Sequence, residues 1–452
     1  MAVRAVLCFA LMVAACGRSG LDARPPVRSG STPDASATSD SGRDYGVVAD
    51  AVASRSDSTP DATTTSDSGK DYGVVTDTVA DSKTYSVGDS ACQWTFGPRI
   101  TYAGQVGEIS PSIGVADLNH DGVTDLTVLA DNIGVLLGHG DGTFAPEVTY
   151  AAGQGTWSLA LADFDGDGNL DVAESNLYYQ TQSINILFGD GRGGFGAPVS
   201  YPAEGPEGIA AADFDGDGHP DIAYSISGGS MTVGVRYNSG DGTFGAPVTY
   251  PADKAPSAVN AADFNGDGHM DFVVECYAAQ TVDVFINQGD GTFAPEISYN
   301  AAIDPEAMTV GDVNGDGHPD IVVANTNGNS VGVLLNHGDG TFAAEVKYDT
   351  GYVSLNPGYL PSMPQSVTVG DFNGDGVADL GVGNSNDNTI GVFLGRGDGT
   401  FAPQITFSEG YQPSSVVAGD FNGDGLADLA FGARLTYGGR DLAIVVLLSR
   451  CQ

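Results

Sequence analysis

The feature that most constrains this chain is one nonapeptide that recurs seven times. The pattern Asp-x-(Asp or Asn)-x-Asp-Gly-x-x-Asp begins at Asp117, Asp163, Asp213, Asp263, Asp312, Asp371 and Asp420. Successive copies are 46, 50, 50, 49, 59 and 49 residues apart, close to the length of one β-propeller blade. Because 452 residues are too many for one ordinary core, repeats that pack on their neighbours are favoured.

Each nonapeptide carries the donors that a hard cation such as Ca²⁺ prefers. Positions 1, 3, 5 and 9 offer side-chain oxygens, position 7 offers a backbone carbonyl, and the glycine at position 6 permits a sharp turn. Without a cation, carboxylates held this close would repel one another. A polar hairpin turn would explain one copy but not seven in register. The predicted ligands, for up to seven Ca²⁺, are Asp117, Asn119, Asp121, Val123, Asp125, Asp163, Asp165, Asp167, Asn169, Asp171, Asp213, Asp215, Asp217, His219, Asp221, Asp263, Asn265, Asp267, His269, Asp271, Asp312, Asn314, Asp316, His318, Asp320, Asp371, Asn373, Asp375, Val377, Asp379, Asp420, Asn422, Asp424, Leu426 and Asp428.

A second recurrent element, GDGTF after an apolar run, completes each repeat. It ends at Phe144, Phe244, Phe293, Phe342 and Phe401, with a variant that ends at Phe195. Asp-Gly between apolar runs indicates a β-hairpin, and neither the helices nor the twelfth-position Glu of an EF-hand is present. The sequence therefore predicts an all-β fold, a seven-bladed β-propeller of four-stranded antiparallel blades (strands A to D) with the acidic loop between A and B.

Two other positions of each repeat predict how the blades pack. The residue before each loop is small, as crowding of the innermost strand near the axis would require: Ala116, Ala162, Ala212, Ala262, Gly311, Gly370 and Gly419. Position 2 is often aromatic and is expected to fill space between blades, at Phe164, Phe214, Phe264, Phe372 and Phe421.

The two ends of the repeat region complement each other. The last repeat stops without GDGTF, whereas Phe96–Tyr102 (FGPRITY) matches Phe144–Tyr150 (FAPEVTY). We expect this N-terminal strand to complete the seventh blade and remove the open edges. Cys92 and Cys451 flank the joined strands, so a disulfide is predicted, with two unpaired thiols as the alternative. Cys276 is expected to be a buried, inert thiol.

Units such as GDFNGDGVADLGVGN joined to GVFLGRGDGTF resemble the FG-GAP or VCBS repeats of integrin alpha-subunit propellers and of many secreted bacterial proteins. The resemblance covers residues 92–452. It implies a calcium-bearing propeller, but it implies no single activity, because functions in the family vary widely.

The N-terminal segment predicts export and a membrane anchor. Residues 1–15 form a signal peptide, with Arg4 before an apolar run too short to span a bilayer. Val13 to Cys16 resembles the lipobox of bacterial lipoproteins, which implies a lipidated Cys16 and, with Gly17 next, the outer membrane or cell surface of a bacterial envelope. An ordinary signal peptide with a chance cysteine is the alternative. Residues 16–91, rich in Ser, Thr and Asp, predict a disordered tether.

The variable B–C and D–A loops share the face opposite the acidic loops and form a candidate ligand face. Their aromatic residues suit sugar rings or a protein partner: Trp157, Tyr178, Tyr179, Tyr277, Tyr352, Tyr359, Tyr411 and Tyr437. Ordinary loop packing is the alternative for each of them. A net charge of −41 argues against nucleic acid, so the expected partners of this monomer are calcium and a glycan or protein ligand.

The histidines argue against hydrolytic catalysis. All six lie in the acidic loops or the GDGTF turns, so none remains for a Ser-His-Asp site. The sequence therefore favours a binding and adhesion module over an enzyme. A polysaccharide-active enzyme, either a lyase or a hydrolase, is the main alternative, since paired carboxylates need no histidine. A purely architectural spacer is a third interpretation.

Overall fold

The computed structural model describes residues 93–106, 112–153, 155–177, 182–227, 231–351, 363–434 and 441–451, with three short strands, β1 (Met12–Val13), β2 (Val75–Thr76) and β3 (Tyr85–Ser86). These residues form strands, turns and bends. The described part contains no helix, hence none suited to cross a membrane. The predicted signal peptide and tether lie almost wholly outside it, as does Cys16. The described strands all belong to one compact unit, residues 1–17 and 72–452.

Blades 1 to 6 are four-stranded antiparallel sheets whose strands pair in chain order. Their strands, from A to D, are β6 (Ser112–Ala116), β7 (Asp125–Leu129), β8 (Ile133–Leu136) and β9 (Val148–Tyr150); β10 (Thr156–Ala162), β11 (Asp171–Asn176), β12 (Ser183–Leu187) and β13 (Val199–Pro202); β14 (Pro206–Ala212), β15 (Asp221–Ile226), β16 (Thr232–Arg236) and β17 (Val248–Pro251); β18 (Pro256–Ala262), β19 (Asp271–Cys276), β20 (Thr281–Phe285) and β21 (Ile297–Asn300); β22 (Pro305–Gly311), β23 (Asp320–Asn325), β24 (Ser330–Leu334) and β25 (Val346–Asp349); β26 (Pro364–Gly370), β27 (Asp379–Asn384), β28 (Thr389–Phe393) and β29 (Ile405–Ser408).

The seventh blade is closed by both ends of the repeat region, as the sequence predicts. It comprises β30 (Gln412–Gly419), β31 (Asp428–Arg434), β32 (Asp441–Leu447) and β5 (Ile100–Val106), with Tyr102 of β5 opposite Ile444 of β32. Next to it, β4 (Gln93–Phe96) pairs with β33 (Ser449–Cys451). Cys92 lies outside the described residues, so the Cys92–Cys451 disulfide stays a prediction.

Three short strands extend these sheets. β2 pairs with the outer edge of β5, and β3 pairs with β4. β1 pairs with β6. The closing segment is also held by side chains, because the Arg99 guanidinium donates a hydrogen bond to the Glu409 carbonyl and lies 4.8 Å from the Tyr411 ring centroid.

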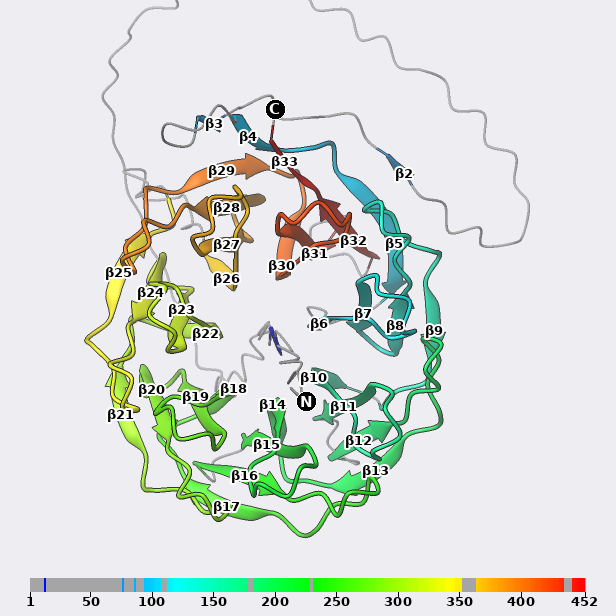
Figure 1. Ribbon diagram of the computed structural model, residues 1–452, viewed down its shortest axis with the longest axis vertical. Helices are drawn as coiled ribbons and strands as arrows, with labels where there is room; N and C mark the ends of the chain where they lie inside the picture. Colours follow the sequence, from blue (N-terminus) through cyan, green and yellow to red (C-terminus); the bar gives the residue numbers. More distant parts are fainter. Residues whose placement is uncertain are drawn as a thin grey trace, which may run out of the picture. The chain divides into compact units, whose positions relative to one another are not determined.

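The A strands line the centre of a ring, where each contacts the A strand of the next blade, and β30 contacts β6 to close the circle (Figure 1). The prediction of a seven-bladed propeller is thereby confirmed. The small residues that end the A strands leave room for this close packing. A Cβ added at Gly370 would lie 2.8 Å from the Ala427 Cβ atom of the next blade.

Aromatic residues fill the space between blades, as the sequence predicts. The phenylalanine at loop position 2 is buried and contacts the GDGTF phenylalanine of the next blade edge-to-face, with ring centroids 5.7 Å apart for Phe164 and Phe244. Phe421 and Phe144 repeat this contact across the closure, at 5.6 Å. Tyrosines of the D strands complete the contact, as where Phe144 N donates to Tyr102 Oη at 2.8 Å.

Candidate metal centres

The seven acidic loops share one turn geometry, which the loop at Asp213 illustrates. Asp213 accepts hydrogen bonds from the backbone N–H groups of Gly216 and Gly218, at 2.8 and 2.9 Å. Asp215 accepts from Asp217 N at 3.2 Å. Gly218, at position 6, has φ near +92°, a left-handed value that glycine adopts without strain. Side-chain oxygens at positions 1 and 3 thus fold the loop around one centre.

The ninth-position aspartate is different, because it begins strand B and is fully buried in every blade. Asp221 Oδ2 accepts a hydrogen bond from Phe214 N at 2.9 Å, and Oδ1 accepts from Asn238 N at 2.7 Å. The same pair of bonds recurs from Asp125 to Asp428. This carboxylate therefore ties the loop to the start of the C–D turn, and both turns lie on the same face.

Burial raises the pKa of these ninth-position carboxyls, and the neighbouring loop aspartates raise it further. The pKa rises to about 7 for Asp171, Asp221, Asp379 and Asp428. It rises to about 6 for Asp271 and Asp320, and burial also raises the pKa of Asp125. A cation in the loop would favour the ionised form of each group.

Two loops bring three carboxylates together. One oxygen each from Asp163, Asp165 and Asp171 lies within 4.8 Å of the others, as it does for Asp213, Asp215 and Asp221. The other five loops have asparagine at position 3, whose amide oxygen takes the same place. Asn265 Oδ1, for example, accepts from Asp267 N at 2.9 Å. An all-oxygen donor set of this kind fits Ca²⁺.

The structure places the predicted metal ligands of each blade in one loop, and it describes three of the eight residues of the candidate ligand face. Trp157 lies within strand β10 rather than in a loop, and it is half-buried. Tyr277 lies in the turn after β19, and Tyr411 packs beneath Arg99. Tyr178, Tyr179, Tyr352, Tyr359 and Tyr437 lie outside the described residues. Cys276 is a buried free thiol, and burial raises its pKa.

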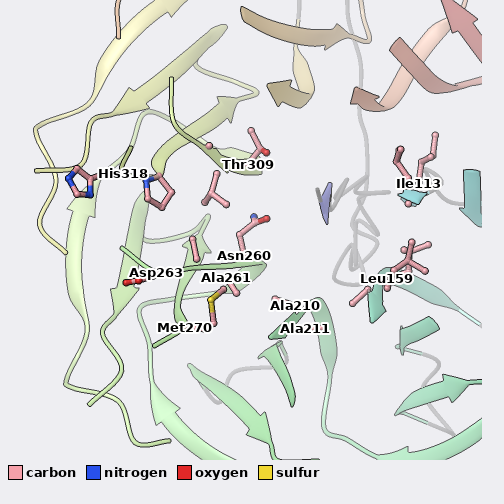
Figure 2. Close-up of a pocket in the computed structure, with 18 of the residues that line it drawn as sticks. Ile113, Leu159, Ala210, Ala211, Asn260, Ala261, Asp263, Met270, Thr309 and His318 are labelled. Carbon is pink, nitrogen blue, oxygen red and sulfur yellow. The ribbon is translucent and has the colours of Figure 1, made fainter. Parts of the chain in front are cut away.

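A cavity of about 510 Å³ lies against the inner strands (Figure 2). Its walls include Ile113, Leu159, Ala210 and Val310, with Asn260 among the few polar groups. Of the described residues that line it, only Asp263 and His318 are ionisable, and both belong to acidic loops. The described part of the lining therefore supplies one carboxylate, Asp263, rather than a pair.

Three asparagines that sequence reasoning missed also touch the loops. Asn238, Asn287 and Asn336 follow strand C in blades 3, 4 and 5, and each is buried. The sequence shows only that each Asn stands two residues before Gly-Asp-Gly, and it gives no sign of a partner some 70 residues away.

Fold and loops together define a seven-bladed propeller with an acidic turn in every blade. The model of the FG-GAP-like repeat matches residues 117–173, 213–274, 276–323, 312–382 and 371–431, which is more than half of the chain. The chain belongs to this repeat family. No curated protein matches it significantly.

Solved structures share the fold at low identity. A streptogramin B lyase is 15% identical, with a TM-score of 0.51, and covers 78% of this chain and 98% of its own. BBS1N in complex with ARL6DN is 11% identical, with a TM-score of 0.52, and the match covers 76% of this chain and 93% of BBS1N. A lectin from Agrocybe aegerita that recognises non-reducing terminal N-acetylglucosamine is 20% identical, with a TM-score of 0.49, and covers 75% and 96%. Such likeness shows the propeller fold alone.

Proposed function

We propose that this protein is a calcium-stabilised propeller that displays a binding face for a protein or carbohydrate ligand at a bacterial cell surface, held there by a lipid on Cys16. The observation that carries the calcium part is the geometry common to all seven loops. Each one places oxygen-bearing side chains at positions 1, 3 and 5 in the same turn and adds a buried aspartate at position 9, and in two loops three carboxylates lie within 4.8 Å of one another. Oxygen donors in this arrangement suit Ca²⁺.

Electrostatics supports a structural role for the cation. The chain has 58 acidic and 17 basic residues, so negative charges within the folded protein repel one another. Among the described residues, the salt bridge between Lys347 and Glu345 lies away from the loops, and no lysine or arginine forms a salt bridge with a loop aspartate. A divalent cation would supply the missing positive charge, and its binding free energy would add to the stability of the fold.

The binding role follows from the contrast between the two faces. One face carries the repeated loops and turns, whereas chain length and sequence vary in the connections on the other. Variable loops on a rigid scaffold are where proteins of this kind place recognition. A binding module is preferred to an enzyme because, among the described residues that line the inner cavity, the ionisable groups Asp263 and His318 both belong to acidic loops.

The calcium role is tested on the full chain by equilibrium dialysis and by thermal melting. We expect several bound Ca²⁺ per chain and a melting temperature that falls when a chelator removes them. Magnesium serves as the control, because its smaller ion demands a tighter octahedral site. A chain that binds no calcium, or melts identically in chelator, would remove the proposal.

The ligand is sought by incubating the calcium-loaded chain with glycan and protein arrays. Retention without turnover supports a binding module. Cleavage of a glycan that produces new reducing ends would contradict the binding module and support the alternative, a polysaccharide-active enzyme.

The anchor is tested separately, by feeding cells a labelled fatty acid and fractionating the envelope. Label that is lost with Cys16→Ala supports the lipid. Unlabelled protein released from the cell contradicts it.

A further inference from the structure

Three buried asparagines connect neighbouring acidic loops through their side chains. Asn287 in blade 4 donates from Nδ2 to the carbonyl of Phe214, at position 2 of the loop in blade 3, at 2.7 Å. Asn238 makes the same bond to Phe164 at 2.8 Å, and Asn336 to Phe264 at 2.9 Å. Each Nδ2 also donates to the position-8 carbonyl of its own loop, as in Asn287 to Met270 at 2.9 Å.

These bonds form part of a continuous chain of contacts. Phe214 N donates to the ninth-position Asp221 of its own loop, while Phe214 O accepts from Asn287. Asn287 N in turn donates to Asp271, the ninth-position aspartate of the next loop, at 2.7 Å. Two buried carboxylates in different blades are therefore separated by the backbone of Phe214 and one asparagine. The relay runs from Asp171 in blade 2 to Asp320 in blade 5.

The remaining junctions lack this side chain. Glycine stands at the equivalent place in blades 1, 2 and 6, at Gly138, Gly189 and Gly395. In blade 7 the place is taken by Ser449, whose hydroxyl donates only to its own position-8 carbonyl, Ala427 O, at 2.6 Å. A backbone bond from Gly142 N to Phe421 O, at 2.9 Å, links blade 1 to blade 7 without such a side chain. The equivalent bond from Gly340 N to Phe264 O, at 3.1 Å, is present in addition to that of Asn336.

We propose that Asn238, Asn287 and Asn336 are positioning residues that couple cation binding in the loops of blades 2 to 5. The inference rests on the proposed calcium function. A cation that holds the ninth-position aspartate of one loop also holds the position-2 backbone bonded to it. The asparagine passes this restraint to the next ninth-position aspartate, since buried hydrogen bonds of this length leave little freedom.

The chain itself suggests the variant that isolates this bond. Asn287→Ser copies blade 7, so it keeps a donor for the carbonyl within its own blade. It loses the reach to Phe214 and, within the same turn, the acceptor that Asn287 Oδ1 offers to Gly289 N at 2.9 Å. Asn260→Ser is the matched control. Asn260 is equally buried and donates to Met308 O in the next blade at 3.1 Å, and within the described part of the chain this bond reaches a strand rather than an acidic loop.

The coupling is measured by hydrogen exchange with mass spectrometry on the full chain, titrated with free Ca²⁺. The midpoint of protection is followed in the peptide that covers the loop at Asp213. Asp267→Ala disables the neighbouring loop in blade 4. With Asn287 present, this change should raise the Asp213 midpoint about five-fold, as for a coupling the size of one hydrogen bond.

In the Asn287→Ser background, disabling the blade-4 loop should leave the Asp213 midpoint unchanged, whereas the Asn260→Ser background should keep the five-fold effect. The loop at Asp420 should not respond in any background. If Asn287→Ser folds poorly, Asn238→Ser with a disabled blade-2 loop repeats the test one junction away.

A five-fold effect that persists in the Asn287→Ser background, or that is absent with Asn287 in place, overturns the coupling while the calcium function stands. If no loop gains protection with calcium, the proposed function itself fails.

Discussion

The acidic loops contain two kinds of aspartate in very different surroundings. The ninth-position residues, such as Asp221, are fully buried and accept two backbone hydrogen bonds each. The residues at positions 1, 3 and 5, such as Asp215, lie at the surface and mainly bond within their own turn. This difference indicates that each loop has two functions. The buried carboxylate joins strands whether or not a cation is present, whereas the exposed carboxylates are candidate cation ligands. The exposed carboxylates hold the turn of their own loop, and among the described residues their hydrogen bonds tie it to no strand.

The largest expected effect comes from pH, since it acts on all seven buried carboxyls together. Their pKa is raised in the folded chain, to about 7 for Asp171 and about 6 for Asp320. A group with a raised folded pKa binds its proton more tightly when folded. Its stabilisation is full below the unfolded pKa, about 4, and is lost as pH rises through the folded pKa.

In excess chelator, therefore, the melting temperature should fall between pH 5 and pH 8, by more than any substitution below. With saturating calcium the fall should vanish, because the cation favours the ionised carboxylate. Melting curves at constant ionic strength check both arms. A chelated protein that is more stable at pH 8 than at pH 5 would contradict the role given to burial.

The next effect is that of removing one buried carboxylate. Asp221→Ala leaves Phe214 N and Asn238 N without their acceptor, at a cost of about 3 kcal/mol. We expect the loss in calcium and in chelator alike, as measured by urea unfolding. Asp221→Asn, which keeps one acceptor oxygen, should cost less. Equal stability of Asp221→Ala and the parent in chelator would mean that this residue acts only as a ligand.

An exposed aspartate should behave in the opposite way. Asp215→Asn removes one of three clustered carboxylates but keeps an oxygen, as five other loops do naturally. With calcium we expect a loss of about 1 kcal/mol, and in chelator a slight gain, because repulsion within the loop falls. Unfolding measured in parallel in both buffers checks the sign. A loss of equal size in both buffers would erase the distinction between the two kinds of aspartate.

Sequence alone predicts the ring because its information is periodic. Seven loops fix seven blades, and the match between Phe96–Tyr102 and Phe144–Tyr150 fixes the closure that β5 and β32 confirm. The role of Asn287 could not be read in this way, since its partner Phe214 is 73 residues distant and belongs to another blade. Trp157 is expected in a loop but lies in β10, because that strand already begins at Thr156, directly after Gly155. The residues of a ligand face differ from blade to blade, so the repeat pattern of the sequence does not identify them.

The smallest expected effect concerns the turn itself rather than either kind of aspartate. Six loops have glycine at position 4, but the first has His120, with φ near +60°. A side chain in this left-handed region costs about 1 kcal/mol, partly offset here by a 3.1 Å contact from His120 Nε2 to Asn169 Oδ1. His120→Gly should therefore stabilise the protein by about 0.5 kcal/mol, with or without calcium. Gly166→Ala is the reverse change at the same position of the second loop and serves as the control. An added Cβ there would meet nothing closer than 3.6 Å, so only the backbone strain near φ +74° should destabilise this variant. If His120→Gly destabilises the chain in both buffers, the contact to Asn169 outweighs the strain. The first loop then depends on its neighbour through a side chain at position 4, where the six other loops have glycine.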